Sequence, residues 1–134
     1  PNLFGFRQRL EYMYGVPWIQ NNVLKEERVF VRDVKVPWAY AEDVASLLWF
    51  IIEMELRGNI KVPKLGFLSE KDIAEKVKQI LNSSCEIVVT KESNNLVTDY
   101  NDKKINFWEP DSNDINDLLE KTIRWFDLNK NWAL

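Results

Sequence analysis

The stretch VPWAYAEDVASLLWFIIEMEL, Val36 to Leu56, decides how the rest of this chain is interpreted. It opens with the β-like run Trp38-Ala39-Tyr40 and then reaches Glu42 and Asp43. Acidic residues favour the first turn of a helix, because the positive end of the helix dipole lies there. The stretch therefore predicts a strand followed directly by a helix.

This helix is apolar on nearly every side. From Val44 to Ile52 only Ser46 is polar, so no polar stripe remains at a 3.6-residue period. The run ends at Glu53, far short of the roughly 20 residues that cross a bilayer. The pattern predicts a central core helix that the rest of the fold covers on most sides.

Length and composition limit the classes of protein. A chain of 134 residues fits one domain, and its net charge of -3 lacks the basic excess that marks nucleic-acid binding. With one cysteine, Cys85, and no histidine, an intrachain disulfide and Ser-His or Cys-His nucleophiles are excluded. No signal peptide or membrane span is visible, so we expect a cytoplasmic protein. Because the chain starts at Pro1, inside a strand-like run, we expect a piece of a longer protein.

Apolar spacing and turn residues predict short strands and about four helices, an α/β chain that would be α+β as an isolated fragment. The strands are expected at Arg28–Asp33, Asn59–Pro63 and Cys85–Thr90, with Lys91–Asn95 as a polar loop. The helices besides the central one are expected at Pro17–Glu26, Ser69–Asn82 and Asn113–Leu128, with a further short one at Asp99–Asn106.

Four short motifs follow one another along the chain. They are Asn2-Leu3-Phe4-Gly5, Val16-Pro17-Trp18-Ile19, Trp38-x-Tyr40-x-Glu42-Asp43-Val44-Ala45 and Phe107-Trp108-Glu109-Pro110. In this order they resemble motifs of the extended short-chain dehydrogenase/reductase family, the NAD-dependent nucleotide-sugar epimerases and dehydratases. The family's patterns are an Asn-x-aromatic-Gly turn, an Ile-Pro-x-Phe-Ile helix start, aromatic-x-Tyr-Val-x-Asp-x-Ala, and Leu-Gly-Trp-x-Pro. The resemblance covers nearly all of residues 1–134 and implies the C-terminal, substrate-binding portion of a Rossmann-type enzyme.

The resemblance also implies that the chemistry lies upstream. The family's Gly-rich dinucleotide turn and its catalytic Tyr-x-x-x-Lys precede the Asn-x-aromatic-Gly turn, and the four glycines of this chain are scattered. NAD or NADP would belong to the intact parent, bound by an N-terminal Rossmann half that is absent here. We expect this chain alone to bind no cofactor and to hold no catalytic residue. Tyr100 and Lys104 have a similar spacing, but they follow the other landmarks, and we expect no catalysis from them.

The substrate that the resemblance implies is a nucleotide sugar. We expect Asn2 and the helix start at Pro17 and Trp18 to line its pocket, because asparagine offers donors and acceptors and helix N-termini leave N–H groups unpaired. Tyr40, within the third motif, joins this set.

This chain lacks one cationic residue that the resembled family uses to bind its substrate. Where the family has an arginine that meets the substrate diphosphate, this sequence has Val36. A desolvated pyrophosphate needs charge-assisted donors, so we expect another cation in its place. The candidates are Arg32, on the same strand phase as Val36, and Arg7 or Arg9 in the loop after Gly5. Lys35 is less suited because a regular strand points it to the opposite face.

A second interpretation is a non-catalytic protein interaction module. It would account for the six tryptophans, the absence of histidine and the missing catalytic motifs. A Gly-rich strand-turn-helix and a Tyr-x-x-x-Lys encoded ahead of Pro1 would exclude it. The sequence also leaves open whether Trp125 and Phe126 face the core or a second copy in a homodimer.

Overall fold

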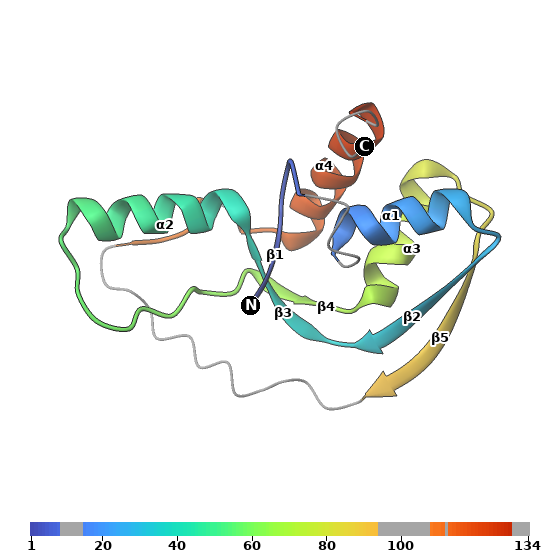
Figure 1. The fold of residues 1–134 in the computed structure, drawn as a ribbon, viewed down its shortest axis with the longest axis horizontal. Coiled ribbons are helices and arrows are strands. Elements are labelled where there is room, and N and C mark those ends of the chain that lie inside the picture. Colours follow the sequence, from blue (N-terminus) through green and yellow to red (C-terminus); the bar gives the residue numbers. More distant parts are fainter. Residues whose placement is uncertain (9–14, 94–107, 112, 130–134) are drawn as a thin grey trace.

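Two small sheets and a group of packed helices make up the fold (Figure 1). The structure, a computed structural model, describes residues 1–8, 15–93, 108–111 and 113–129. One sheet holds β1 (Asn2–Phe4), β3 (Val36–Tyr40) and β4 (Gly66–Leu68), and the other holds β2 (Arg28–Val34) and β5 (Glu86–Ser93). The helices are α1 (Val16–Lys25), α2 (Ala41–Glu53), α3 (Glu70–Leu81) and α4 (Ile115–Leu128). This arrangement confirms the predicted α/β class.

The parallel strand pairs set the framework. β1 runs parallel to β3, and β2 runs parallel to β5. Parallel neighbours need a long crossover, and here the segment that contains α1 and β2 connects β1 to β3. β4 completes the first sheet on the other side of β3, antiparallel to it.

The core lies between these sheets and the helices α1, α3 and α4, which pack on one another. Phe126 belongs to this core at 6% exposure. Trp125 is half-buried and stacks on Phe6, with ring centroids 5.7 Å apart. The largest fully buried apolar side chains are Phe4, Val16, Ile19, Val23, Val31, Leu47, Ile73, Val77, Leu119 and Ile123.

The central helix is not a core helix of this chain, so that prediction is wrong. α2 has its main contacts with β3 and projects away from the other helices (Figure 1). Only Asp43 and Leu47 in it are buried, whereas Trp49 is 63% and Ile52 67% exposed. An all-round apolar pattern shows that a helix needs cover, but it does not show which part of a protein supplies it. None of the described helices is long and apolar enough to cross a membrane.

Two further predictions are wrong. Residues 59–63 form no strand, and the chain instead joins β3 later, where the Leu65 N–H donates to the Trp38 carbonyl at 2.7 Å and Gly66 begins β4. Gly66 suits this place because a Cβ there would lie 3.2 Å from Ile115 of α4. The polar run from Lys91 to Ser93 continues β5 rather than forming a loop. The predicted helix at 99–106, with Tyr100 and Lys104, lies outside the described residues.

The predicted helix after Ser69 is confirmed, together with its capping box. The Ser69 hydroxyl accepts from the Asp72 N–H at 3.1 Å, and the Asp72 carboxylate accepts from the Ser69 N–H at 2.6 Å. Asn82 ends the helix in the left-handed conformation. The predicted helices at Pro17–Glu26 and Asn113–Leu128 and the strand at Arg28–Asp33 are also present, with ends shifted by one or two residues.

Replacing Ser69 with alanine should therefore lower the free energy of unfolding by about 1 kcal/mol, the usual cost of losing an N-cap side chain. The measurement is urea denaturation followed by circular dichroism. Ser84→Ala, at an exposed serine after the same helix, is the matched control and should change little. A loss below about 0.3 kcal/mol for Ser69→Ala would contradict the role of this cap.

Candidate functional site

A pocket of about 180 Å³ lies where the starts of β1 and α3 meet β2, β3 and the end of β5. One part of its wall is apolar and the other part is polar or charged. At this volume it is smaller than typical pockets for whole ligands, which measure about 300–1,000 Å³, so it suits one group of a larger ligand. The lining residues are Asn2, Gly15, Ile19, Arg32, Val34, Val36, Trp38, Glu70 and Lys91. We call it the Arg32 pocket.

Arg32 is held in this pocket by Glu70, the first residue of α3. The Glu70 Oε1 accepts from Arg32 Nε at 2.9 Å and also from Nη2, while Oε2 accepts from the Arg32 backbone N–H at 2.9 Å. Burial raises the pKa of Glu70, but the hydrogen bonds and charge of Arg32 outweigh this and leave the pKa below its usual value. The same hydrogen bonds raise the pKa of Arg32. Both groups are therefore charged at neutral pH.

Lys91 stands beside Arg32 on the neighbouring strand. Up to Val89 the two strands pair residue by residue, but Thr90 is skipped, so that Lys91 is the partner of Arg32. The Thr90 hydroxyl donates to the Val31 carbonyl at 3.2 Å across this bulge. The bulge brings two cations to the same wall, since paired residues of a sheet point to the same face.

Lys91 forms no salt bridge with any carboxylate among the residues that the structure describes, although Glu70 lines the same pocket. Arg32, in contrast, shares its charge with Glu70. Lys91 therefore attracts an anion to this pocket more strongly than Arg32 does. Sequence reasoning missed it because the polar run after Thr90 resembles a loop; the signal that could have found it is the β-branched run that leads directly into Lys91.

Asn2 and Trp38 form the next part of the wall as partners in the β1–β3 pair. The Trp38 indole Nε1 donates to the Leu68 carbonyl at 3.1 Å, which fixes the ring. Asn2 is exposed and its side-chain amide can serve a ligand as donor and acceptor. Val36, at the position where the resembled family has an arginine, also lines the pocket. Asn2 and Arg32 are thus the two predicted substrate-binding residues that the structure brings together here.

A row of ion pairs ties the β2–β3 connection to the first turn of α3. Besides Arg32–Glu70, Lys71 pairs with Asp33 at 3.2 Å and Lys35 pairs with Asp72. Lys35 is not part of the pocket lining, in agreement with its predicted opposite orientation.

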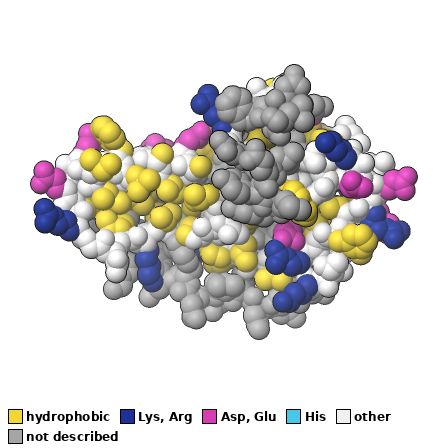
Figure 2. Space-filling view, in the orientation of Figure 1, with side chains coloured by type: hydrophobic (Ala, Val, Ile, Leu, Met, Phe, Trp, Pro, Cys, Tyr) yellow, Lys and Arg dark blue, Asp and Glu magenta, His cyan; other side chains and the backbone are white. Residues whose placement is uncertain are grey.

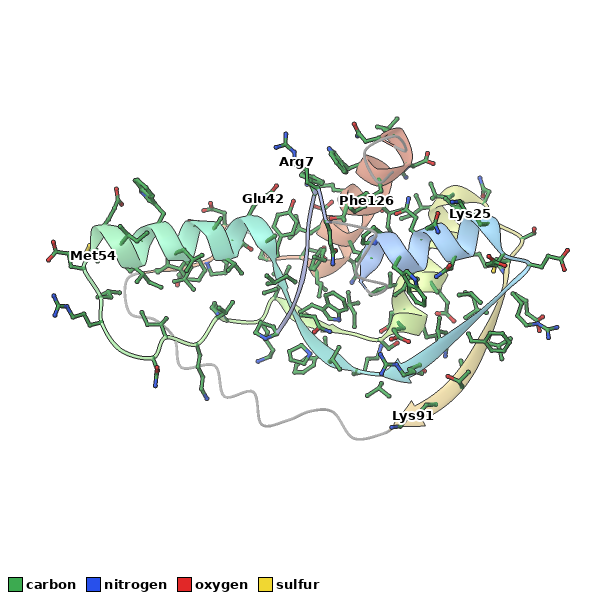
Figure 3. All side chains as sticks on the ribbon, in the orientation of Figure 1. Arg7, Lys25, Glu42, Met54, Lys91 and Phe126 are labelled. Carbon is green, nitrogen blue, oxygen red and sulfur yellow. The ribbon has the colours of Figure 1, made fainter. Side chains whose placement is uncertain are left out.

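Of the other predicted residues, those that the structure describes do not belong to the lining of the Arg32 pocket. The start of α1 contributes Gly15 and Ile19 to the lining instead of Pro17 and Trp18. Arg7 lies on the turn after β1 with a positive φ of 62°, and Figure 3 shows it far from Lys91. Arg9 lies outside the described residues.

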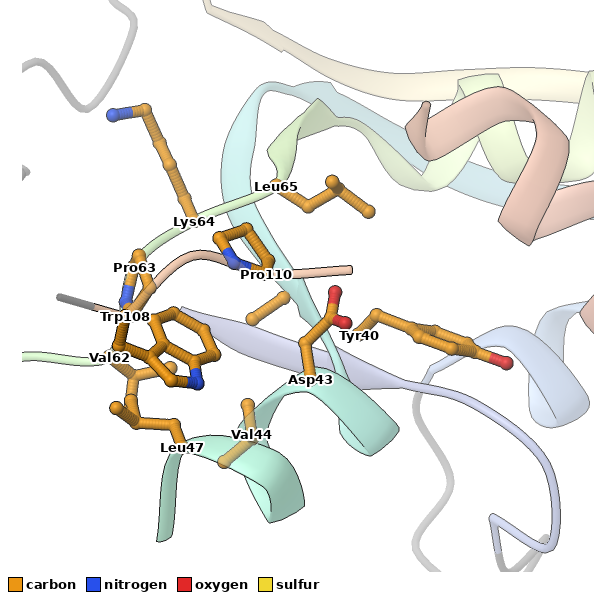
Figure 4. Close-up of a pocket in the computed structure, with 11 residues that line it drawn as sticks. Tyr40, Asp43, Val44, Leu47, Val62, Pro63, Lys64, Leu65, Trp108 and Pro110 are labelled. Atoms are coloured by element: carbon orange, nitrogen blue, oxygen red, sulfur yellow. The ribbon is translucent and has the colours of Figure 1, made fainter. Parts of the chain in front are cut away.

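Tyr40 lies at a second, much smaller pocket (Figure 4). Its volume of about 10 Å³ has room for roughly one water molecule, and Asp43, Trp108 and Pro110 are among its other lining residues. The Tyr40 ring packs against Phe4, with centroids 5.4 Å apart. Burial, followed by a hydrogen bond with Glu42, raises the pKa of Tyr40 well above its ordinary value. We therefore interpret Tyr40 as a packing residue rather than a ligand contact.

A dinucleotide turn needs closely spaced glycines between a strand and the following helix. The β3–α2 junction, Tyr40-Ala41, and the β4–α3 junction, Leu68-Ser69-Glu70, contain no glycine, and the sequence between β1 and α1 has glycines only at Gly5 and Gly15. Within the part of the chain that the structure describes, no group of three or more Cys, Asp or Glu side chains could hold a metal.

Comparison with solved structures identifies the fold. A GDP-L-fucose synthetase from Naegleria fowleri bound to NADP matches with a TM-score of 0.65 and 17% identity, over 97% of this chain and 44% of that chain. A dTDP-glucose 4,6-dehydratase from Bacillus anthracis in complex with NAD matches with a TM-score of 0.70 and 17% identity, over 98% of this chain and 44% of that chain. A GDP-mannoheptose C4 reductase from Campylobacter jejuni with NADP bound matches with a TM-score of 0.65 and 14% identity, over 94% of this chain and 51% of that chain. No protein-family model and no curated protein sequence matches this chain.

These matches confirm the fold that the four motifs predicted. The chain shares the fold of part of these three enzymes, each of which was solved with NAD or NADP bound. It spans about half the length of the solved structures that it matches. At these identities the likeness concerns the fold, and the activity is argued below.

Proposed function

We propose that residues 1–134 are the substrate-binding portion of an NAD(P)-dependent epimerase, dehydratase or reductase that acts on a nucleotide sugar. The observation that carries the proposal is the Arg32 pocket, where neighbouring parallel strands place Arg32 and Lys91 beside Asn2. Pyrophosphate binds best to several charge-assisted donors. The fold similarity to three nucleotide-sugar enzymes supports the same assignment, whereas the interaction-module interpretation gains no support from them.

Each polar residue of the pocket has a distinct role in this proposal. Lys91 attracts a phosphate group, and Arg32 offers the N–H groups that Glu70 does not occupy. Asn2 hydrogen-bonds a phosphate or sugar oxygen, while the buried side chains of Ile19 and Trp38 form apolar parts of the wall. These residues bind and orient the substrate; when bound, a nicotinamide cofactor would accept and return hydride, held by residues outside this chain.

The proposed partner is the dinucleotide-binding half of a longer polypeptide. β1 pairs with β3 and with no other described strand, so its second edge can accept a further strand. On α2, Ala45, Leu48, Trp49 and Ile52 follow an i, i+3, i+4, i+7 spacing, and all four are exposed. Figure 2 shows hydrophobic side chains gathered over this helix. A cytoplasmic location and a homodimer remain predictions.

Calorimetry with UDP-, GDP- and dTDP-linked sugars tests the proposal on the polypeptide as its gene encodes it. One of these ligands should bind, and Arg32→Ala should weaken it about tenfold, the effect of one charge-assisted contact. The 134-residue chain alone should show no NAD binding in the micromolar range. Arg28→Ala, at a guanidinium that pairs with Glu86 outside the pocket, is the control. No binding of any nucleotide sugar, or equal effects of the two arginine variants, would contradict the proposal.

A further inference from the structure

Glu70 is a carboxylate in the wall of a pocket that the proposed function assigns to an anion. Both of its oxygens are directed at Arg32, through the side chain and the backbone N–H. Its side chain is 27% exposed, against 64% for Arg32. The cap at Ser69 fixes the start of α3 and with it the position of Glu70. This carboxylate is therefore a fixed feature of the pocket.

Glu70 lowers the positive charge that a ligand meets. Among the described lining residues Arg32 and Lys91 are cationic and Glu70 is anionic. A phosphate group beside the guanidinium must also lie near this carboxylate, because Glu70 occupies the Nε side of Arg32. Each added negative charge on the ligand gains attraction to the two cations but also repulsion from Glu70.

Phosphate groups differ in the charge that they bring. A phosphate that links nucleotide and sugar carries one negative charge, whereas a terminal phosphate has a second pKa near 6 and carries about 1.5 to 2 charges at pH 7. A fixed carboxylate in the wall therefore weakens the binding of a terminal phosphate more than the binding of a phosphate that links nucleotide and sugar. Repulsion of a competitor is one of the two general sources of specificity.

We propose that Glu70 determines specificity at this site: it selects the esterified diphosphate of a nucleotide sugar against free nucleoside diphosphates. The inference rests on the proposed function, since it requires the Arg32 pocket to bind the diphosphate. It assigns Glu70 a role in ligand choice in addition to holding Arg32 in place.

The test compares each nucleotide sugar with its free nucleoside diphosphate, in the uridine, guanosine and thymidine series, by calorimetry at pH 7.5. Glu70→Gln keeps a side-chain oxygen as acceptor but removes the charge. It should shift the ratio of the two dissociation constants by about fivefold in favour of the free diphosphate, the size of one partly exposed charge pair. Glu70→Asp keeps the charge and should preserve the wild-type preference. Glu86→Gln, at the carboxylate that pairs with Arg28, should leave the ratio unchanged.

Repeating the comparison at lower pH gives a second test. Near pH 5.5 the terminal phosphate loses most of its second charge, while Glu70 stays ionised because its pKa is lowered. The effect of Glu70→Gln on the ratio should therefore shrink at that pH. An unchanged ratio at pH 7.5 in a folded Glu70→Gln protein would overturn this inference and leave the proposed function intact. Failure of wild-type protein to bind any nucleotide sugar would overturn both.

Discussion

Replacing Lys91 with alanine should weaken nucleotide-sugar binding by about tenfold to a hundredfold, because a hydrogen bond to a charged group contributes about 1.5–3 kcal/mol. The expected effect exceeds that of Arg32→Ala, since Arg32 is already paired with Glu70 whereas Lys91 forms no salt bridge with a described carboxylate. Calorimetry on the polypeptide as its gene encodes it gives the dissociation constants.

Two comparisons make this result specific. Lys25→Ala removes an exposed lysine at the end of α1, away from the pocket lining, and should leave affinity unchanged. Raising the salt concentration should weaken the wild-type complex more than the Lys91→Ala complex, because screening acts on the charge that the variant lacks. A loss below about threefold for Lys91→Ala would mean that the anion binds elsewhere.

The double substitution Trp49→Ser and Ile52→Ser should change the free energy of unfolding by very different amounts in two polypeptides. In the 134-residue chain both side chains are largely exposed, so the free energy of unfolding should change by no more than about 0.5 kcal/mol. In the longer polypeptide these side chains would be covered by the dinucleotide-binding half. Burial of one such side chain contributes about 1.5–3 kcal/mol, so the loss there should be about 3–6 kcal/mol.

Urea denaturation of both polypeptides measures this difference. Substituting Ser46 and Glu53 by alanine, on the more polar side of the same helix, gives the matched control and should have a small effect in either context. An equally small effect of Trp49→Ser and Ile52→Ser in the longer polypeptide would show that the apolar face of α2 is not where the two halves meet.

Local signals predicted the parts of the fold that local interactions form. The helix after Ser69 is the example, because its capping box joins residues only three apart and the apolar spacing of Ile73 and Val77 follows directly. The end of β5 and the start of β4 depend instead on pairing with strands far away in the chain. No spacing within Asn59–Pro63 indicates that β3 pairs with later residues instead.

The candidate site shows the same difference between local signals and contacts with distant parts of the chain. Arg32, which we expected to replace the family arginine, lines one pocket with Asn2 and Val36. The expected shared strand phase is not the reason, because Arg32 lies on β2 and Val36 on β3, in different sheets. Lys91 and Glu70 reach that pocket through a bulge and through helix packing, which no motif encodes. Sequence reasoning therefore selected Asn2 and Arg32 of the pocket lining but missed two of its charged groups.

The skipped residue at Thr90 makes the charge of the pocket depend on the length of β5 as well as on its composition. Without the bulge, Thr90 would pair with Arg32, and Lys91 would pair with Asp33 on the opposite face of the strand. Deletion of Thr90 would leave Lys91 opposite Arg32, whereas insertion of one residue between Thr90 and Lys91 would move Lys91 opposite Asp33. Such an insertion would withdraw a cation from the pocket while every charged residue of the chain is retained. Related chains could diverge in ligand preference by this route, which a comparison of charged residues alone would overlook.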